Sequence, residues 1–333
     1  HFPKPGKPVV KAATILEVVK GAEFASSRGL PLFILGGGSN LVVSDTGWPG
    51  VVLKLAIAGI EQRSDGDKTV FAVGAGTLWD QFVAHVVALD CAGVECLSGI
   101  PGSVGGTPVQ NVGAYGQEVS QTIQSVSALD LETGNVCELT NENCGFRYRT
   151  SIFNTSHRGR YIILGVSYRL VPHGKPNLLY AELRNHFSGW NEIPTLADVR
   201  EAVRKIRASK GMLIIDGDED CRSAGSFFKN PVLSAERFEE MTRRASEKKL
   251  QIPNYPALEA QRKISAAWLV EHSGFSKGFT SGSVGISRKH ALAIVNRGGA
   301  TASDVITLKD HIQDRVDSIW GVRLEPEPVF VGF

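Results

Sequence analysis

Residues 97–119 constrain this chain most, because they combine dense glycine with apolar side chains and show neither a helical nor a strand period. The stretch holds six glycines: Gly99, Gly102, Gly105, Gly106, Gly113 and Gly116. Glycine costs backbone entropy on folding, so such density indicates a backbone that must approach another group closely. Ile100, Val104 and Tyr115 have largely apolar side chains that a fully solvated loop would leave exposed to water. We therefore expect a buried loop whose N–H groups face an anion such as a diphosphate, with a plain surface loop as the alternative.

A second glycine cluster, residues 36–40, lies between two short apolar runs that are expected to be strands, 32–35 and 41–43. A Rossmann fold requires G-x-G-x-x-G at the start of a helix, and neither the third glycine nor the helix is present. Three glycines followed by Ser39 and Asn40 favour close approach to phosphate oxygens, with a tight bend as the alternative. The G-x-G at 74–76 is interpreted as a short connection.

Composition excludes several classes of protein. A chain of 333 residues predicts two or three domains. Its formal net charge of +2 argues against a nucleic-acid-binding protein, for which a strongly basic patch is expected. No apolar run reaches the length of a membrane span and no signal peptide opens the chain, so we expect a cytoplasmic protein without membrane insertion. The five cysteines show no CxxC pair and no metal-binding spacing, which favours reduced structural thiols and no metal site.

Apolar periodicity predicts an α+β chain whose first half is rich in strands. Helices are expected at 13–28, from Trp79 onward, at 195–209, near 235–247, at 263–272 and at 302–319. Strands are expected at 32–35, 41–43, 51–55, 69–73, 125–131, 135–139, 161–170, 291–296 and 329–331. A boundary follows residues 171–176. The acidic run 216–220 lacks the spacing and closing glutamate of a calcium loop, so we expect an exposed acidic loop.

Four motifs, in order along the chain, resemble a known family. They are Gly-Gly-Gly-Ser-Asn at 36–40, the glycine-rich stretch at 97–119, Tyr-Arg-Thr-Ser-Ile-Phe at 148–153 and Ala-Gly-Ser-Phe-Phe-Lys-Asn-Pro at 224–231. With them the chain resembles the UDP-N-acetylenolpyruvoylglucosamine reductases, also called UDP-N-acetylmuramate dehydrogenases, from about Phe2 to its end. The resemblance implies a two-lobed FAD-binding domain of the vanillyl-alcohol-oxidase (PCMH) type followed by an α+β substrate-binding domain. It places lobe 1 at 1–56, lobe 2 at 57–194 and the substrate-binding domain at 195–333, with the last strand returning to the FAD domain.

The resemblance further implies an NADPH-dependent flavoenzyme. Such an enzyme reduces the enolpyruvyl ether of UDP-N-acetylglucosamine enolpyruvate to UDP-N-acetylmuramate, for peptidoglycan synthesis and hence cell shape and division. No histidine occurs between Phe2 and Val83, and Cys91 and Cys96 lie outside the glycine loops, so non-covalent FAD is expected. The residues that match the family's cofactor-binding motifs are Gly36, Gly37, Gly38, Ser39, Asn40, Ile100, Pro101, Gly102, Gly105, Gly106, Asn111, Gly113, Ala114 and Tyr115.

The family's chemistry also assigns three catalytic positions. Hydride added to the terminal methylene of the substrate leaves an enolate-like carbanion beside its carboxylate, which needs an acid and stabilisation of the negative charge. The resemblance implies Ser226 as the acid and Arg149 and Glu327 as electrostatic partners. On the residues alone, Ser226 could be a turn or cap residue, Arg149 a surface salt bridge and Glu327 part of an exposed turn.

Further positions are implied to bind the substrate: Tyr180, Arg207, Lys210, Lys229, Asn230, Tyr255, Lys263 and His290. Tyr180 indicates the subclass in which a tyrosine loop covers the substrate, with packing at a helix start as the alternative. His290 replaces a glutamine found in many relatives, residues 210–224 are longer than usual, and His1-Phe2-Pro3 stands where the family has Thr-Phe-Gly. Residues 1–3 could therefore alter the N-terminal flavin contacts.

Two other functions stay open at this point. One is another FAD oxidoreductase of the same domain type, and the other is a non-catalytic flavin-binding redox sensor that regulates a partner. The leading interpretation gives a UDP-sugar and NADPH as partners and a monomer as the oligomeric state.

Overall fold

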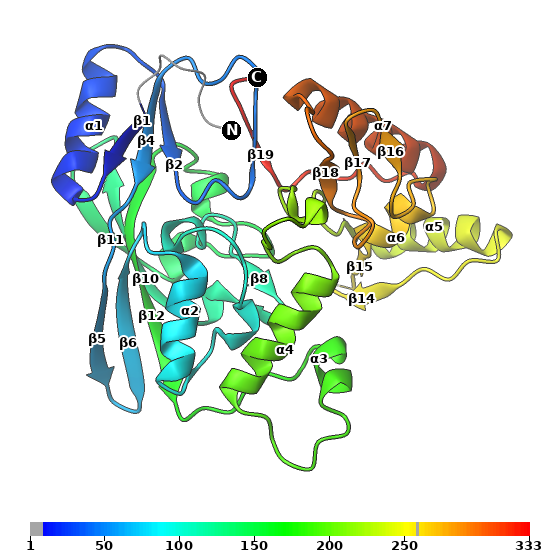
Figure 1. Ribbon diagram of the computed structural model, residues 1–333, viewed down its shortest axis with the longest axis horizontal. Coiled ribbons are helices and arrows are strands. Elements are labelled where there is room, and N and C mark those ends of the chain that lie inside the picture. The colour runs from blue at the N-terminus through cyan, green and yellow to red at the C-terminus, as the bar shows by residue number, and fades with distance from the viewer. Residues whose placement is uncertain (1–8, 258–259) are drawn as a thin grey trace. The chain divides into compact units, whose positions relative to one another are not determined.

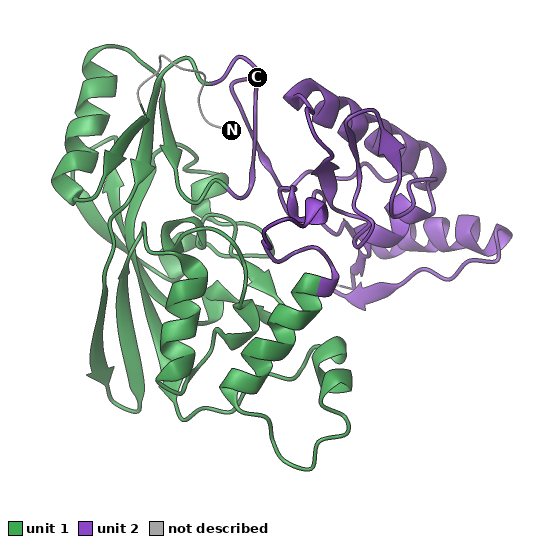
Figure 2. Ribbon diagram, viewed as in Figure 1, with its two compact units in different colours: residues 1–38, 48–208 green, residues 39–47, 209–333 purple. Residues whose placement is uncertain are grey.

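The computed structural model describes residues 9–257 and 260–333 (Figure 1). Contacts divide the chain into two compact units, unit 1 with residues 1–38 and 48–208, and unit 2 with residues 39–47 and 209–333 (Figure 2). No helix in the described ranges is both long enough and apolar enough to cross a membrane. The flavin contacts expected of residues 1–3 lie outside the described residues.

A parallel sheet and one helix form the N-terminal part of unit 1. The sheet has the order β1–β4–β2, with β1 (Val9–Ala12), β4 (Val51–Leu55) and β2 (Leu32–Leu35). Helix α1 (Ile15–Ser27) supplies the crossover that parallel strands require. Thr14 and Glu17 start this helix as a capping box, in which each side chain accepts a hydrogen bond from the other residue's backbone N–H.

The second sheet of unit 1 is antiparallel and carries a large apolar core. Its order is β11–β10–β12–β6–β5, with β7 paired to β12: β5 (Ile60–Asp65), β6 (Lys68–Gly74), β7 (Cys91–Ala92), β10 (Ile123–Asp130), β11 (Val136–Thr140) and β12 (Tyr161–Pro172). Helix α2 (Trp79–Ala88) packs Trp79 and Phe82 on the buried Tyr168 ring, with centroids 5.7 and 4.9 Å away. The Tyr168 hydroxyl shares a 2.7 Å hydrogen bond with Thr107, so this core also anchors the glycine-rich stretch.

Helices α3 (Ala181–His186) and α4 (Leu196–Ser209) build a separate apolar cluster in unit 1. Leu183, Val199 and Val203 are fully buried there together with Cys96. This packing joins α4 to unit 1, whereas the sequence-based division starts the substrate-binding domain at residue 195. A short hairpin, β8 (Gly113–Ala114) and β9 (Gln117–Glu118), lies within the glycine-rich stretch.

Unit 2 combines small sheets with three helices in its described residues. The sheets are β3 (Leu41–Val43) with β19 (Val329–Val331); β13 (Val232–Leu233), β15 (Arg262–Ile264) and β14 (Asn254–Pro256); and β16 (Thr280–Ser281), β17 (Val284–Ile286) and β18 (Ile294–Asn296). Helices α5 (Ala235–Glu247), α6 (Ala266–Glu271) and α7 (Ala302–Trp320) share one apolar core with them. Leu308, Ile312 and Val316 form the buried stripe of α7, as the apolar spacing predicts.

Strand β3 belongs with the C-terminal strand although it lies early in the sequence. Val329 of β19 pairs with Leu41 of β3 in a parallel register. Asp45 then accepts hydrogen bonds from the N–H groups of Ala302 and Ser303, at 2.8 and 3.2 Å, where α7 begins. These bonds assign residues 39–47 to unit 2, whereas the sequence-based division places them in lobe 1.

Candidate active site

The two glycine clusters meet in unit 1. A Cβ atom at Gly37 would lie 2.4 Å from the Cα of Gly102, and one at Gly36 would lie 3.1 Å from the Oγ of Ser103. Backbones approach this closely only where side chains are absent. Two stretches that are distant in the sequence therefore form one surface, which we call the glycine surface (residues 36–38, 102 and 103).

The glycine surface carries polar groups that the described chain does not use. Among residues 9–257 and 260–333, the amide N–H groups of Gly37, Gly38 and Gly102 donate to no acceptor. The buried Ser103 hydroxyl likewise has no hydrogen-bond partner there. Of these groups only the Ser103 hydroxyl is buried, and a buried polar group without a partner is rare and requires water or a ligand. Clustered N–H groups beside a hydroxyl fit the oxygens of a diphosphate.

The turn at residues 74–77 is hydrogen-bonded to the residues that follow the glycine surface in the chain. Val104 and Gly105 donate their N–H groups to the carbonyls of Thr77 and Ala75, both at 2.9 Å. Gly76 permits the close packing, because a Cβ atom there would lie 2.5 Å from the Cα of Ala56. The G-x-G at 74–76 is thus a connection that packs against Ala56 and binds residues 104 and 105.

Arg149 lies on a tight turn beside the same stretch. Arg147 and Thr150 exchange both backbone hydrogen bonds, at 2.9 and 3.0 Å, which leaves Tyr148 and Arg149 as the turn residues. The Nη2 of Arg149 donates to the carbonyl oxygen of Gly113 at 2.9 Å. The structure therefore brings the predicted catalytic arginine against predicted cofactor-binding residues.

Predicted ligand-binding side chains also gather at the end of β8. Tyr180 stands at the N-cap of α3, and its ring meets that of Tyr115 edge-on with centroids 5.4 Å apart. Burial lowers the pKa of the Arg207 guanidinium and raises the pKa of Tyr115 to about 12, and these two side chains share a hydrogen bond. A buried guanidinium beside a phenol hydroxyl suits an anionic ligand group.

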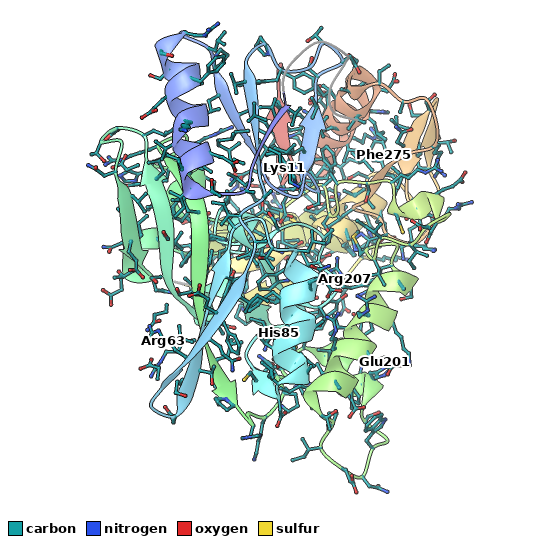
Figure 3. The ribbon with its side chains drawn as sticks, turned by 60° about the vertical axis from the view of Figure 1, so that its left-hand side comes forward. Lys11, Arg63, His85, Glu201, Arg207 and Phe275 are labelled. Atoms are coloured by element: carbon teal, nitrogen blue, oxygen red, sulfur yellow. The ribbon has the colours of Figure 1, made fainter. Side chains whose placement is uncertain are left out.

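Asp80, which the sequence analysis does not single out, anchors this cluster. It accepts hydrogen bonds from Arg200 at 2.6 and 3.0 Å, from Arg204 at 2.6 Å and from the Gly99 N–H at 2.6 Å. Arg207 donates to the Gly99 carbonyl at 3.2 Å, and Figure 3 shows α4, which bears Arg207, running beside α2. The sequence offers one signal for this cluster: Arg200, Arg204 and Arg207 recur on one face of the predicted helix, which indicates an acidic partner.

Ser226 stands in an extended segment of unit 2 that is bonded on both sides. The N–H of Phe227 donates to the Leu292 carbonyl at 2.8 Å, and the N–H of Glu327 donates to the Phe227 carbonyl at 2.9 Å. Gly225, with φ of 80°, makes the turn that precedes the serine. Within the described ranges the Ser226 hydroxyl forms no hydrogen bond. We call this arrangement the Ser226 ladder (residues 226–229, 292 and 325–327).

The Glu-Pro-Glu segment belongs to that ladder and is extended, with a bridge between Pro326 and Phe228, although Glu325 is exposed. Lys229 donates its N–H to the Glu325 carbonyl at 2.9 Å. Asn40, a predicted cofactor-binding residue, donates from Nδ2 to the Glu327 carbonyl at 3.1 Å. Residue 40 and the predicted catalytic glutamate are therefore joined within unit 2.

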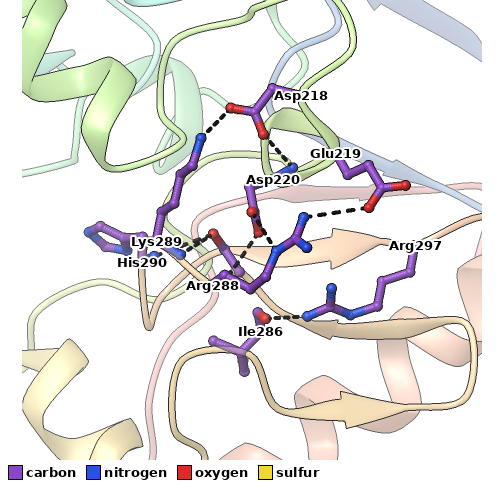
Figure 4. A network of polar contacts seen from close by, with 9 residues as sticks. Asp218, Glu219, Asp220, Ile286, Arg288, Lys289, His290 and Arg297 are labelled. Atoms are coloured by element: carbon purple, nitrogen blue, oxygen red, sulfur yellow. Dashed lines mark hydrogen bonds and ion pairs between the residues drawn. The ribbon is translucent and has the colours of Figure 1, made fainter.

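The acidic residues 218–220 form an ion-pair network, and the expectation of an exposed loop is wrong for Asp220, which is 2% exposed (Figure 4). Asp220 accepts hydrogen bonds from the backbone N–H and the Nε of Arg288, at 2.8 and 3.0 Å. Burial alone would raise the pKa of Asp220, but the bonds to Arg288 bring it below its ordinary value. Lys289 pairs with Asp218 at 2.5 Å.

His290 follows directly on this network. Its Nδ1 accepts the N–H of Leu292 at 3.0 Å, so neutral His290 carries its proton on Nε2. Because the Leu292 carbonyl is the acceptor for Phe227, the network fixes a turn that leads into the Ser226 ladder.

The remaining predicted substrate-binding residues lie in unit 2. Tyr255 and Lys263 are opposite one another in the β14–β15 pair. Lys229 pairs with Glu325 at 3.1 Å. The Asn230 side chain accepts the N–H of Ala266 at 2.8 Å at the start of α6, which gives this residue a structural task. Lys210 follows α4 in the chain.

Known families match most of the chain in two parts. Residues 6–140 match a family described as FAD binding domain, and residues 217–331 match one described as UDP-N-acetylenolpyruvoylglucosamine reductase, C-terminal domain. The matches confirm the predicted fold class, in which an FAD-binding domain precedes a second α+β domain.

Similar proteins span nearly the whole chain. A UDP-N-acetylenolpyruvoylglucosamine reductase from Thermobifida fusca is 44% identical over 95% of this chain and 90% of its own length. One from Mycobacterium tuberculosis is 42% identical over 96% and 88%. The crystal structure of a UDP-N-acetylenolpyruvylglucosamine reductase from Thermus caldophilus matches with a TM-score of 0.64 at 26% identity, covering 98% of this chain and 93% of that chain.

Proposed function

The chain belongs to the UDP-N-acetylenolpyruvoylglucosamine reductase family, and we propose that Ser226, Arg149 and Glu327 perform its reaction. It is an FAD-binding reductase of peptidoglycan synthesis that acts on the enolpyruvyl ether of a UDP-sugar. We take NADPH as the hydride donor. The observation on which the assignment rests is the Ser226 ladder, which holds the serine beside Glu327 while leaving its hydroxyl unbonded among the described residues.

The glycine surface is the proposed binding site of the FAD diphosphate. Gly37, Gly38 and Gly102 offer N–H donors there, and Ser103 offers its buried hydroxyl. When bound, FAD supplies hydride transfer between a nicotinamide and the substrate double bond. Attachment is proposed to be non-covalent, because Cys91 and Cys96 are buried and burial raises the pKa of both thiols, which makes them poor nucleophiles.

Ser226 is proposed to protonate the substrate carbon next to the carboxylate. A serine hydroxyl is a weak acid, but a carbanion is basic enough to take its proton. Ser226 is half-buried, so bulk water would replace its hydroxyl poorly. Glu327 is proposed to help stabilise or protonate the enol form of the substrate.

Arg149 is proposed to bind the substrate carboxylate and stabilise the enolate. A guanidinium presents paired donors that match a carboxylate, and its positive charge favours the negative charge that develops next to it. The bond to the Gly113 carbonyl holds this side chain beside the stretch that is proposed to bind the cofactor.

The UDP-sugar is proposed to be bound by Tyr180, Arg207, Lys210, Lys229, Asn230, Tyr255, Lys263 and His290. Arg207, as a buried cation, suits the diphosphate best. We further propose a monomer that works in the cytoplasm, where reducing conditions suit five free thiols.

Ser226→Ala tests the catalytic assignment through separate half-reactions. Bleaching of the flavin by NADPH needs no proton from Ser226, so FAD content and bleaching rate should stay at the wild-type level. Recovery of colour by the enolpyruvyl substrate should slow about 10²–10⁴-fold, the usual loss when a general acid is removed. Anaerobic stopped-flow absorbance measures both steps. Ser226→Cys should regain part of the rate, because a thiol donates from nearly the same place.

Ser246→Ala is the matched control, since Ser246 is exposed on α5 of the same unit. It should equal the wild type in both steps. Colour recovery at the wild-type rate in Ser226→Ala, or an equal loss of both steps, would make Ser226 a structural turn residue.

A further inference from the structure

Arg149 adopts a backbone conformation that its residue type disfavours. Its φ is 54°, in the left-handed region that favours glycine. It occupies the last position of the two-residue turn between Arg147 and Thr150, where glycine or asparagine normally stands. Strained conformations of this kind persist only where the surroundings over-determine them, and they cluster at functional sites. The chain must therefore contain groups that hold this turn.

Asn154 is one such group, and it bonds both to Arg149 and to the segment that follows the turn. Its Nδ2 donates to the Arg149 carbonyl at 3.1 Å. Its Oδ1 accepts the N–H of Ser151 at 2.9 Å. One carboxamide thus fixes the exit of the turn, and no other side-chain type of this length offers a donor and an acceptor together.

The partner residues of Asn154 are themselves held firmly. Ser151 is fully buried, and its hydroxyl donates to the Val109 carbonyl at 2.6 Å and accepts the N–H of Phe153 at 3.1 Å. Asn154 closes the short helical turn Ile152–Asn154 that Ser151 starts. The carboxamide therefore links the firmly held segment 151–154 to the backbone of Arg149.

A second asparagine fixes the entrance of the same turn. Asn111, which is 1% exposed, donates from Nδ2 to the Arg147 carbonyl at 3.1 Å. The Arg149 side chain in turn donates to the Gly113 carbonyl. The entrance of the turn and the Arg149 side chain are thus bound to the glycine-rich stretch, while Asn154 binds the Arg149 carbonyl at the exit.

We propose that Asn154 is a positioning residue for Arg149: its carboxamide holds the left-handed backbone from which the guanidinium reaches the substrate carboxylate. This inference rests on the proposed role of Arg149 in stabilising the enolate. Asn154 itself touches neither substrate nor cofactor in this scheme, so its effect passes through Arg149 alone.

A double-mutant cycle with Asn154→Asp and Arg149→Ala tests the proposal. Aspartate keeps the acceptor for the Ser151 N–H and loses the donor for the Arg149 carbonyl. Asn154→Asp alone should slow colour recovery by the enolpyruvyl substrate about tenfold, the usual effect of one lost hydrogen bond on a positioned group. Bleaching by NADPH, FAD content and melting temperature should remain near the wild-type values. In the Arg149→Ala background the same change should slow recovery no further.

The control is Asn143→Asp, which places the same charge on another short turn of unit 1, where Asn143 accepts from Thr140. It should leave both half-reactions unchanged. If Asn154→Asp fails to retain FAD, Asn154→Ser takes its place in the same cycle.

The possible failures are distinct. Independent, multiplicative effects of the two substitutions would overturn the positioning role while leaving the role of Arg149 intact. A wild-type recovery rate in Arg149→Ala would instead overturn the proposed function on which this inference rests.

Discussion

At the scale of single residues, Arg207 is proposed to determine what the cluster at the end of β8 binds. Burial lowers the pKa of its guanidinium, so the charged form needs strong acceptors or an anion beside it. Tyr115 lies next to it, and the Tyr180 ring packs edge-on against Tyr115. Tyr180 is 43% exposed although its ring packs against Tyr115.

Tyr180→Phe should raise the KM for the sugar nucleotide and leave flavin bleaching by NADPH near normal. Only the hydroxyl is lost, because phenylalanine keeps the ring contact with Tyr115. A hydrogen bond to a charged group contributes about 1.5–3 kcal/mol, or roughly 10–150-fold in KM. Steady-state kinetics measure this. Tyr161→Phe, in another ring cluster of unit 1, is the control. An unchanged KM would place Tyr180 away from the diphosphate.

The sequence could not predict the roles of residues whose partners lie far away in the chain or carry no motif. Asp220 looks exposed among its acidic neighbours, but its partner Arg288 comes much later in the chain. Asn154 has no feature in the sequence that separates it from other loop asparagines. Ser226 was assigned through the resemblance alone, since a serine before two phenylalanines says nothing about proton donation.

At the scale of elements, long periodic segments were predicted well. The helices α1, α2, α4, α5 and α7 and the strands β2, β3, β4 and β19 are confirmed close to their expected bounds. The helix expected at 263–272 starts later, because residues 262–264 form β15. Strand β5 is mostly exposed and shows no alternation, and β13 to β17 are too short to show a period. The approach of Gly37 to Gly102 depends on tertiary structure and has no sequence signal.

The contact between α2 and α4 gives a prediction for stability. Burial tends to raise the pKa of Asp80, but hydrogen bonds from Arg200 and Gly99 bring it below its ordinary value. A lowered carboxyl pKa stabilises the fold above the unfolded-state pKa, and this contribution is lost as the pH falls through the folded-state pKa.

Asp80→Asn should therefore lower the melting temperature by about 2–4 °C at pH 7, which corresponds to about 1 kcal/mol for a chain of this size class. The difference from the wild type should shrink in acid, once the wild-type carboxyl is protonated. Thermal melts at neutral and acid pH measure this. Asp67→Asn, which removes an exposed ion pair with Lys68, should change the melting temperature little. A difference that grows in acid would contradict the assigned role of Asp80.

At the scale of the whole molecule, each unit contains part of the predicted site. Unit 1 contains Arg149, Arg207 and the glycine surface, and unit 2 contains Ser226 and Glu327. The sequence predicted these sets through motifs, but it could not show that residues 39–47 belong with the C-terminal strand. That assignment comes from the pairing of β3 with β19, two strands that are almost 290 residues apart in the sequence.

The assigned activity of the whole molecule is the FAD-dependent reduction of an enolpyruvyl UDP-sugar. An anaerobic visible titration of the purified protein tests this most directly. The protein should be yellow, one equivalent of NADPH should bleach the flavin band, and one equivalent of UDP-N-acetylglucosamine enolpyruvate should restore it, with UDP-N-acetylmuramate as the product. A colourless protein that takes up no FAD, or a bleached flavin whose colour the enolpyruvyl substrate does not restore, would contradict the account.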